Sequence, residues 1–549
     1  MAIYQEQEPR RRTLLLFALF IFLLSYPLWH IGERELFWSE GKYACISGDA
    51  MSFPPVMTPH DQFDAKVYPL YPILVKAVSK CGFSMEFSLR AVSILSLFLL
   101  TLIIYFACSR AGGPQAGAAG AIATFTSLLC AEKAIEGYPT MLTVLILYGG
   151  WLLWFEFSMS KGNWNYAWLT AGVFSSLAYY SAGPTGLILF LLPLLFQRRP
   201  LNVWTKLRYS GFYAAVILVA ATILFYYAPQ WELQQPPQTV ESLSFSAWLE
   251  HFLTFPVDLI IRFLPWSLLL WTPFCAALIP LERNPLFGKY HRMLFCITLL
   301  FLWLKPGAAR EMLYLMPLIA TIAGMNYWII IRRYGWKILR MYRIYGWILL
   351  ILCALACGFL FCPENWLRYL QPVFDAEAYR KILQPAPILA GQVAAGAVLI
   401  AVGLYLSRNH TKIWQIAALL FCGMMFLFWA MVYPFRTAEH EKRDFGTRIR
   451  QVLDSEKDFK NMPSAVLYKD STISGLYGEC YYIGVPVRTV DIKMNFPVQD
   501  EFVYVLSTGV PSSSERGWIR LYDMVYKDAH LYLYKGQLRK DEYDDYGDD

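Results

Sequence analysis

The stretch ERELFWSEGKYACISGDAMSFPPVMTPHDQFDAKVYPLY, which runs from Glu33 to Tyr71, is the polar segment around which the rest of the chain is organised. It contains carboxylates, lysines and prolines, and it directly follows an apolar run of membrane-span length. Connections between helices usually have only a handful of residues, so this charged loop is longer than a connector needs. We therefore expect it to form the floor of a reaction site.

The composition indicates the class of protein. The chain has 549 residues, of which 57% are hydrophobic and 16% are charged, and its mean hydropathy is +0.38. Soluble proteins carry about 25% charged residues, so these values indicate a chain with many membrane spans. The net charge of +7 is spread over short loops, which indicates membrane orientation and argues against nucleic-acid binding.

Apolar runs of span length recur along the chain. The first follows Arg10, Arg11 and Arg12, and no small-residue cleavage site follows it, so we interpret it as a retained span with a cytoplasmic N-terminus. About thirteen runs are candidate spans by this criterion. They are 13–31, 89–108, 114–132, 138–157, 166–182, 184–197, 209–228, 257–280, 292–304, 312–331, 345–361, 387–407 and 413–433.

Basic residues fall in alternate connections, as the positive-inside rule requires. The predicted inner loops hold Arg110, Lys161, Arg198, Arg199, Lys206, Arg208, Arg283, Lys289, Arg292, Arg332, Arg333, Lys337, Arg340, Arg343, Arg408 and Lys412. The loops 33–88, 229–256 and 362–386, together with the tail from Pro434, then lie outside the cytoplasm.

The tail has a different pattern from the rest of the chain. Residues 437–455 are amphipathic and predict a helix, and the segments SAVLYKD, YYIGVPVRTVDI, EFVYVLST and DAHLYLYKG predict short strands. The predicted fold is thus mainly α: a polytopic helix bundle over 1–434, with a site-bearing outer loop at 32–88, and a small α/β domain over 435–540. The acidic end, 541–549, is predicted to be disordered.

The cysteines give little functional signal. There are 11 of them, and most lie inside apolar runs, which predicts small buried hydrophobic residues. Cys45 and Cys81 belong to the outer loop, where a disulfide between them is an open alternative.

Candidate reactive groups gather in the predicted outer connections. The acids are Glu40, Asp61, Asp64 and Glu136, and the cations are Lys42, Lys66, Lys133 and Arg310. A carboxylate can take a hydroxyl proton while Lys or Arg neutralises a departing phosphate. This set suits a reaction between a lipid-borne phosphate donor and a hydroxyl acceptor at the membrane surface.

Each candidate also has a structural explanation. Glu40 could be a solvated loop acid, Lys66 a snorkelling lysine, and Arg310 with Glu311 an interfacial ion pair. Glu136 could stabilise the start of the following helix. No cofactor is required by these residues, and a divalent metal bound by His60, Asp61 and Asp64 is a weak alternative.

The order of these residues resembles the membrane glycosyltransferases of the GT-C fold, in the bacterial branch of the lipid A aminoarabinose transferases and the relatives of protein O-mannosyltransferases. That family has Asp-Glu-x-Arg-Tyr-Ala, then Ser-Gly-Asp, then Lys-Pro-Pro-x-x-Tyr in its first outer loop. The matching residues here are Ser39, Glu40, Gly41, Lys42, Tyr43, Ala44, Ser47, Gly48, Asp49, Lys66, Pro69 and Tyr71.

Three later segments are similar as well. AEKAIEGYPTML resembles the Ala-x-x-Asp-x-x-Leu site of the family and places Glu136 at its acid. YYSAGPTGL resembles its Thr-Lys-Gly-Pro segment through Gly183 and Pro184, and KPGAAREMLYLMP resembles Lys/Arg-x-x-Tyr-x-x-Pro through Arg310, Tyr314 and Pro317. The resemblance therefore extends over essentially the whole chain.

The sequence departs from the family pattern at three points. The leading Asp of the family, its usual catalytic carboxylate, falls on Ser39, so Glu40 is the acid that remains in the motif. The Lys of Lys-Gly-Pro falls on Ala182, and Lys-Pro-Pro is replaced by Lys66-Val67-Tyr68-Pro69.

The resemblance implies an enzyme that transfers a sugar from a polyprenyl-phosphate donor to a lipid, protein or glycan acceptor, with inversion. It implies Glu40 as base, Lys66 and Arg310 as main donor-phosphate contacts, and Lys42 and Arg90 as secondary contacts. Ser39, Tyr43, Asp64, Tyr71, Glu136 and Tyr314 would support the site. The implied location is the bacterial inner membrane, with a periplasmic C-terminal domain.

Two alternatives from other classes remain open at this point. A transporter or flippase of lipid-linked sugars could use the same cations without a base. A silent membrane scaffold, whose outer domain binds a partner, is compatible with Ser39 in place of Asp. The sequence contains no evident internal repeat, which argues against a secondary transporter.

Overall fold

The computed structural model divides into two compact units, each built from segments that are distant in sequence. The helical unit comprises Met1–Glu33 and Arg90–Ala438, and the loop–domain unit comprises Arg34–Leu89 and Glu439–Asp549. The structure describes residues 31–37, 40–49, 68–133, 136–197, 201–232, 245–307, 309–363, 382–383, 386–408, 413–438, 441–461, 466–470, 472–473, 476–490, 502–511, 516–526 and 529–538. The first outer loop is thus grouped with the C-terminal residues, whereas the linear division predicted from sequence places it in the segment 1–434.

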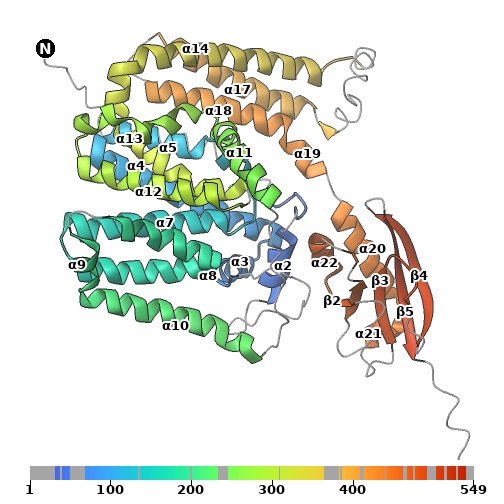
Figure 1. Ribbon diagram of the computed structural model, residues 1–549. Coiled ribbons are helices and arrows are strands. Elements are labelled where there is room, and N and C mark those ends of the chain that lie inside the picture. The colour runs from blue at the N-terminus through green and yellow to red at the C-terminus, as the bar shows by residue number, and fades with distance from the viewer. Residues whose placement is uncertain are drawn as a thin grey trace, which may run out of the picture. The chain divides into compact units, whose positions relative to one another are not determined.

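The described part of the helical unit consists of helices and their connections (Figure 1). The α-helices are α4 (Met85–Gly112), whose first residues belong to the other unit, α5 (Pro114–Phe125), α6 (Leu128–Lys133), α7 (Thr140–Phe155), α8 (Trp164–Phe196), α9 (Val203–Leu207), α10 (Ser210–Glu232), α11 (Phe245–Arg262), α12 (Pro285–Leu304), α13 (Met316–Met325), α14 (Tyr327–Leu360), α17 (Ala386–Leu406), α18 (Ile413–Met431) and α19 (Tyr433–Ala438). A π-helix, η2 (Glu156–Ser160), extends α7, and three 3₁₀ helices are η3 (Ser267–Phe274), η4 (Ala276–Leu281) and η5 (Ala309–Leu315).

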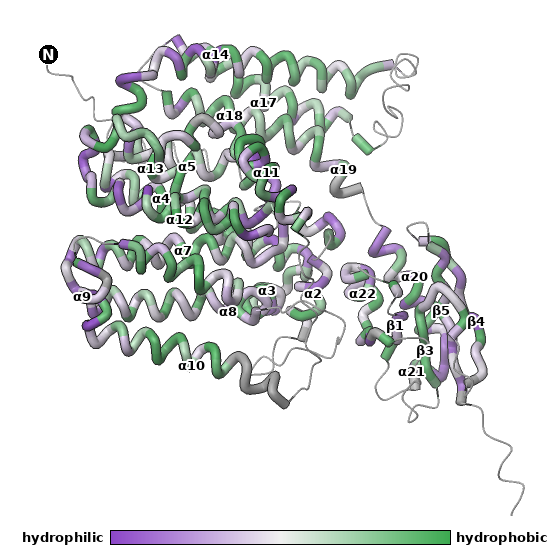
Figure 2. The backbone as a smooth tube through the Cα atoms, viewed as in Figure 1, coloured by the Kyte–Doolittle hydropathy of each residue, from purple (hydrophilic) through white to green (hydrophobic). Residues whose placement is uncertain are grey.

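Six helices in the described residues are long and apolar enough to cross a membrane. They are Met85–Gly112, Thr140–Ser160, Trp164–Phe196, Tyr327–Leu360, Ala386–Leu406 and Ile413–Phe435. Figure 2 shows the apolar residues along them in green. The prediction of a mainly helical, multi-pass protein is therefore confirmed. The exact number of spans stays a prediction, since most of the first run, 13–31, lies outside the described residues.

Helix α8 contains the boundary that the sequence predicts between the runs 166–182 and 184–197. Gly183 has φ 64° and ψ −147°, which L-residues with a side chain rarely adopt. A Cβ atom on Gly186 would clash with the carbonyl oxygen of Ala178, so the chain reverses at Gly183 and its two halves lie side by side. The two predicted runs are confirmed as separate helical segments.

The predicted span 257–280 is wrong. Helix α11 ends at Arg262, and the chain continues as the short 3₁₀ helices η3 and η4. Pro265, Pro273 and Pro280 lie in this region. Each proline lacks the backbone N–H that a continuous α-helix needs, so the apolar run cannot form one span-length helix.

The predicted boundaries around 312–345 also need correction. The run 312–331 is divided, because α13 ends at Met325 and α14 begins at Tyr327. Helix α14 then continues through the basic stretch from Arg332 to Arg343, which the sequence assigned to an inner loop. Arg332, Arg333 and Arg340 are exposed on that helix. The basic residues therefore lie on the exposed surface of a helix and not in a loop.

Small residues allow close packing inside the helical unit. Gly120 of α5 and Gly324 of α13 both lie against Cys108 of α4, where an added Cβ atom would come within 3.0 Å and 2.8 Å of its Sγ atom. Such small-residue contacts let membrane helices approach closely. Cys108, Cys130, Cys353 and Cys422 are buried, as predicted, whereas Cys296 is exposed.

All of the cysteines are free, so the alternative of a Cys45–Cys81 disulfide is wrong. Cys45 is buried in α2, where its Sγ atom lies 3.9 Å from the carbonyl oxygen of Tyr477, and Cys81 is exposed just after α3.

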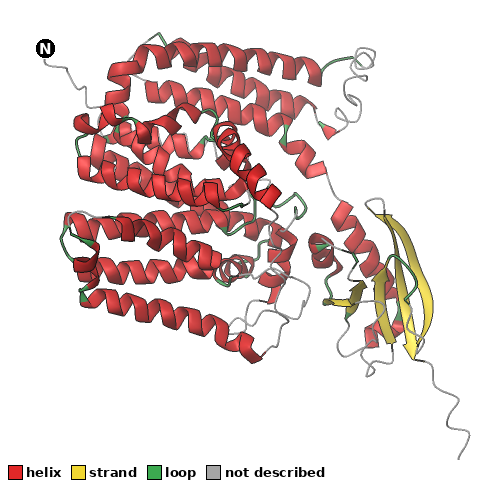
Figure 3. Ribbon diagram, viewed as in Figure 1, coloured by secondary structure: helices red, strands yellow, loops and turns green. Residues whose placement is uncertain are grey.

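The loop–domain unit contains a small sheet (Figure 3). Its described strands are β1 (Leu467–Asp470), β2 (Val487–Val490), β3 (Phe502–Ser507), β4 (Arg516–Tyr526) and β5 (Ala529–Leu538), in the order β2-β1-β3-β5-β4. Strand β1 is parallel to β2 and β3, and β5 is antiparallel to β3 and β4. Its helices are α2 (Glu40–Asp49), α3 (Leu70–Ser79), α20 (Glu441–Ser455), α21 (Lys457–Asn461) and α22 (Tyr477–Ile483).

The amphipathic helix predicted in the tail is α20. Its buried residues Phe445, Ile449 and Leu453 recur every four positions and pack with Leu467, Tyr504 and Leu533 of the sheet. Two details differ from the prediction. Residues 481–483 belong to helix α22, and β4 was not predicted, because its exposed Ile519 and Val525 interrupt a simple alternation.

Candidate functional site

Glu40 begins helix α2 and is fully buried. One of its carboxylate oxygens, Oε2, accepts a hydrogen bond of 2.9 Å from the backbone N–H of Phe37 and lies 3.8 Å from Nη2 of Arg34. Arg34 is also buried, and its guanidinium lies over the ring of Phe37. The interpretation of Glu40 as a solvated loop acid is therefore wrong, because its side chain is completely buried and begins a helix.

Glu35 anchors the same segment to the C-terminal residues. Its carboxylate accepts from the backbone N–H groups of Lys442 and Arg443 at 3.0 and 3.3 Å, and its Oε1 atom lies 3.4 Å from Lys442 Nζ. These N–H groups belong to the first turn of α20, where a negative charge is favourable. The carboxylate is almost completely buried, so this contact holds residues 34–37 against α20.

A second polar contact involves Glu86, Arg443 and Tyr482. Arg443 Nη2 lies 3.3 Å from Glu86 Oε1, and the Tyr482 hydroxyl donates to the same oxygen at 3.2 Å. The hydroxyl oxygen also accepts from the backbone N–H of Leu36. Burial, followed by the nearby charge of Glu86, raises the pKa of Tyr482, so the hydroxyl remains a donor throughout the neutral range.

Helix α2 packs closely on α22. A Cβ atom on Gly41 would clash with the backbone of Tyr477 and Gly478, so this contact requires glycine. Behind it, Tyr43 and Tyr71 make an edge-to-face contact with ring centroids 5.5 Å apart, and the Tyr71 hydroxyl donates to Leu89 O at 2.7 Å. The motif residues Gly41, Tyr43 and Tyr71 thus serve packing within the loop–domain unit.

In the helical unit, Tyr138 brings three elements together. Its carbonyl oxygen accepts from the Ser93 hydroxyl of α4 at 3.0 Å, and its ring lies 3.8 Å from the guanidinium carbon of Arg310 in η5. Tyr138 itself lies in the turn just before α7. Stacking on an aromatic face leaves the edge N–H groups of a guanidinium available for a further ligand.

Arg310 differs from Lys133 and Lys305 of this unit. Lys133 lies 2.9 Å from Glu136 and 3.1 Å from Glu132, and Lys305 lies 3.6 Å from Glu311 and donates to Thr185. Arg310 is half-buried, and in the described part of the chain it has no ion pair. The predicted Arg310–Glu311 pair is therefore wrong, since Glu311 pairs with Lys305.

The remaining predicted residues fall into two groups. Lys42, Arg90 and Tyr314 are buried, and Arg90 donates to the carbonyl oxygen of Ile31. Ser39, His60, Asp61, Asp64 and Lys66 lie outside the described residues. Where residues are described, no group of three or more His, Cys, Asp or Glu could hold a metal ion.

Several residues that shape these sites were not predicted from the sequence. They are Arg34, Glu35, Glu86, Ser93, Tyr138 and Tyr482. Tyr138 lies two positions after the motif acid Glu136. This short spacing is a signal from which the role of Tyr138 could have been predicted. The partners of Glu35 and Glu86 are hundreds of positions away, so no local pattern indicates them.

Comparison with known proteins supports the fold. No family model matches the chain, and no curated protein matches its sequence. Two solved structures of ArnT from Cupriavidus metallidurans match it with a TM-score of 0.65: one bound to undecaprenyl phosphate, at 14% identity, and one in the apo state, at 15% identity. Each match covers 95% of this chain and 97% of the ArnT chain.

This chain has the ArnT fold. ArnT is a lipid A aminoarabinose transferase of the GT-C fold, so the resemblance that the first outer loop suggested is confirmed at the level of the fold. The match extends over nearly the whole of both chains, so it includes the helical unit together with the C-terminal residues.

Proposed function

We propose that this protein is an integral membrane glycosyltransferase that moves a sugar from a polyprenyl-phosphate donor to an extracytoplasmic acceptor. The observation that carries the proposal is the ArnT fold over 95% of the chain, together with the undecaprenyl phosphate bound to one ArnT structure. The six long apolar helices of the described residues suit a substrate that resides in the membrane. The acceptor is a lipid A-like glycolipid, a protein or a glycan.

In the proposed reaction, an acceptor hydroxyl oxygen attacks the anomeric carbon of the sugar from the face opposite the phosphate. The bond between this carbon and the phosphate oxygen breaks, and polyprenyl phosphate leaves with the electron pair. Glu40 takes the hydroxyl proton. Its fixed carboxylate, held by Phe37 N–H and next to Arg34, needs little reorganisation when the acceptor arrives.

Arg310 is the cation best suited to the donor phosphate. It is half-buried, stacked on Tyr138, and free of ion pairs in the described part of the chain. Its planar group can make two charge-assisted hydrogen bonds to phosphate oxygens. Arg90 is almost completely buried and bonded to Ile31 O, so it suits a positioning role better than direct contact. Lys42 and Lys66 complete the proposed set of phosphate-side cations.

The test is an assay of the purified full chain in nanodiscs with a panel of polyprenyl-phosphate sugars and envelope acceptors. Release of free polyprenyl phosphate, together with a mass gain on an acceptor, is the expected result, and it identifies the donor. Donors that bind while no acceptor gains mass would contradict the proposal and favour a transporter of lipid-linked sugars.

A further inference from the structure

A lateral groove of about 750 Å³ lies in the helical unit between α4, α7, α8 and the start of α12. Its volume is in the range of small-molecule ligand sites, which is about 300–1,000 Å³. Side chains of Leu99, Phe106 and Leu153 along it are 43%, 52% and 43% exposed. These apolar groups face the surroundings of the helices, which for a membrane helix are lipid.

The length of the groove corresponds to one leaflet. Its lining runs from Leu99 to Arg110 on α4 and, in parallel, from Leu145 to Glu156 on α7 and η2. At 1.5 Å per residue each side is about 16 Å long, and half of the hydrocarbon core of a bilayer is about 15 Å thick. An acyl chain of a phospholipid fits this length, whereas a long isoprenoid exceeds it.

One end of the groove is polar and carries both signs of charge. Arg110 Nη1 lies 3.1 Å from Glu156 Oε2, and Nη2 lies 3.5 Å from Glu156 Oε1. The Arg110 side chain is 75% exposed and that of Glu156 is 25% exposed. An exposed pair of this kind contributes little to stability, so a ligand with its own charges can replace the pairing at little cost.

We infer that the groove binds one phospholipid whose headgroup carries both a phosphate and a primary ammonium. The phosphate binds Arg110, the ammonium binds Glu156, and an acyl chain lies along the apolar walls. A purely anionic lipid would bring its phosphate close to Glu156 without neutralising that carboxylate. Because Arg110 lies in a predicted inner connection, the bound lipid belongs to the cytoplasmic leaflet.

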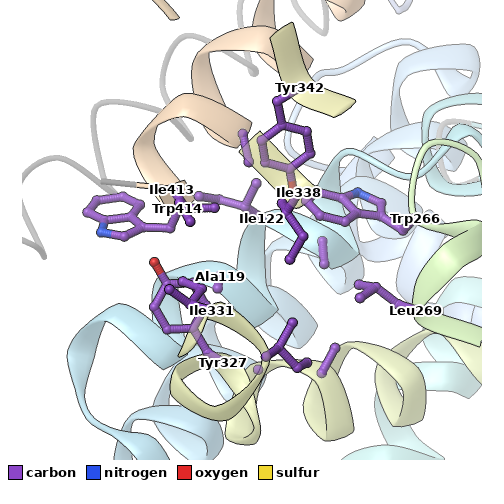
Figure 4. A pocket seen from close by; sticks show the side chains of 15 residues that line it. Ala119, Ile122, Trp266, Leu269, Tyr327, Ile331, Ile338, Tyr342, Ile413 and Trp414 are labelled. Carbon is purple, nitrogen blue, oxygen red and sulfur yellow. The ribbon is translucent and has the colours of Figure 1, made fainter. Parts of the chain in front are cut away.

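A second cavity in the helical unit lacks the charged end that the groove has. It measures about 70 Å³, and its lining includes Trp266, Tyr327, Tyr342 and Trp414 (Figure 4). Its lining has no charged residue, so nothing in it would select a headgroup, and its volume is too small for a lipid chain. Of these two cavities, the groove is the one that combines apolar walls with a charged end.

The test uses native mass spectrometry of the full chain with equal amounts of phosphatidylethanolamine and phosphatidylglycerol. Wild type is expected to retain one phosphatidylethanolamine, with a preference of up to about fivefold, since an ionic contact at this partly exposed end is weak. Glu156→Gln should invert the preference towards phosphatidylglycerol, because the ammonium loses its partner. Arg110→Gln should reduce retention of both lipids.

Two further variants separate specific binding from general lipid association. Gly149→Leu adds a side chain at the groove, and the Gly149 position accepts a Cβ atom, whose nearest neighbour would be Phe174 at 3.8 Å. It should abolish retention of either lipid. The control Arg333→Gln removes an exposed cation on α14, away from the groove, and should leave the preference unchanged. Equal retention of both lipids in wild type, or a preference that survives Glu156→Gln and Gly149→Leu, would overturn the inference.

Discussion

The polar residues of the two units serve different purposes. In the loop–domain unit, Glu35, Glu40 and Glu86 are buried or nearly so, and each has at least two donors within 4 Å. In the helical unit, Arg310 is half-buried and stacked on Tyr138, and it has no ion pair in the described part of the chain. Glu35 and Glu86 therefore stabilise the local structure, whereas Arg310 remains available for a ligand.

This difference predicts two kinds of variant. Substitutions at Glu35, Gly41 and Tyr482 should lower stability, because their contacts hold the first outer loop on α20 and α22. A substitution at Arg310 should lower activity and leave stability nearly unchanged. The expected effects decrease in the order given below.

Among the variants that test this difference, Arg310→Ala should have the largest effect. It removes the proposed phosphate contact, so turnover of the polyprenyl-phosphate donor should fall by about 10²–10³-fold, the cost of removing one electrostatic stabiliser of a transition state. The measurement is the rate of polyprenyl phosphate release with donor varied. Lys305→Ala is the matched control, because Lys305 already pairs with Glu311. An equal loss of turnover in both variants would contradict the proposal that Arg310, and not Lys305, binds the donor phosphate.

Glu35→Ala should destabilise the protein by about 3 kcal/mol, because it removes a buried carboxylate that accepts from the backbone N–H groups of Lys442 and Arg443 and pairs with Lys442 Nζ. Thermal unfolding of the purified full chain measures the effect as a lower melting temperature. The control is Glu33→Ala, since Glu33 is exposed. Equal melting temperatures of the two variants would show that Glu35 does not anchor the loop.

Gly41→Ala should destabilise by about 1–3 kcal/mol, the usual cost of overpacking. The added methyl group meets the backbone of α22, which cannot move aside as a flexible side chain could. Gly48→Ala is a control in the same helix, since a Cβ atom there meets nothing within 4 Å. Limited proteolysis of α2 provides the measurement. If Gly48→Ala exposes the helix as much as Gly41→Ala does, the packing explanation fails.

Tyr482→Phe should have the smallest effect, about 1–2 kcal/mol, because it removes the hydrogen bonds that the hydroxyl makes with Glu86 and with the backbone N–H of Leu36. The raised pKa of Tyr482 means that its contribution is fully present below pH 10, the ordinary tyrosine value, and declines as the pH rises above that value. The difference between wild type and variant should therefore be constant from pH 6 to about 9 and decrease above about 10. A difference that changes near pH 7 would contradict this assignment.

The sequence predicted the helical class and much of the arrangement, for physical reasons that can be named. Apolar runs indicated helices such as α17 and α18 within one or two residues, because a helix in the membrane needs an uninterrupted apolar run of about this length. Gly183 and Pro184 indicated the boundary inside α8. The same criterion failed at 257–280, where three prolines interrupt an otherwise apolar run.

The site was less predictable than the fold. Local patterns identified Glu40, Glu136 and Arg310, but a pattern does not show whether a charge is used in folding. Glu35 binds Lys442 across more than four hundred positions, and only the tertiary structure brings these residues together. Glu311 pairs with Lys305, and the adjacent Arg310 stacks on Tyr138. This choice of partner also depends on side-chain positions that sequence spacing does not determine.

The most direct test of the central claim measures turnover and thermal stability on the same samples of wild type and Glu40→Gln. Glutamine keeps an oxygen that can accept from Phe37 N–H, so the start of α2 should survive, while the base is lost. The account predicts a fall in turnover of about 10²–10⁴-fold, the usual contribution of a general base, in samples that remain folded at the assay temperature, although loss of the charge next to buried Arg34 should lower the melting temperature. Full turnover in a destabilised Glu40→Gln protein would show that Glu40 only stabilises the loop, and would contradict its role as the base.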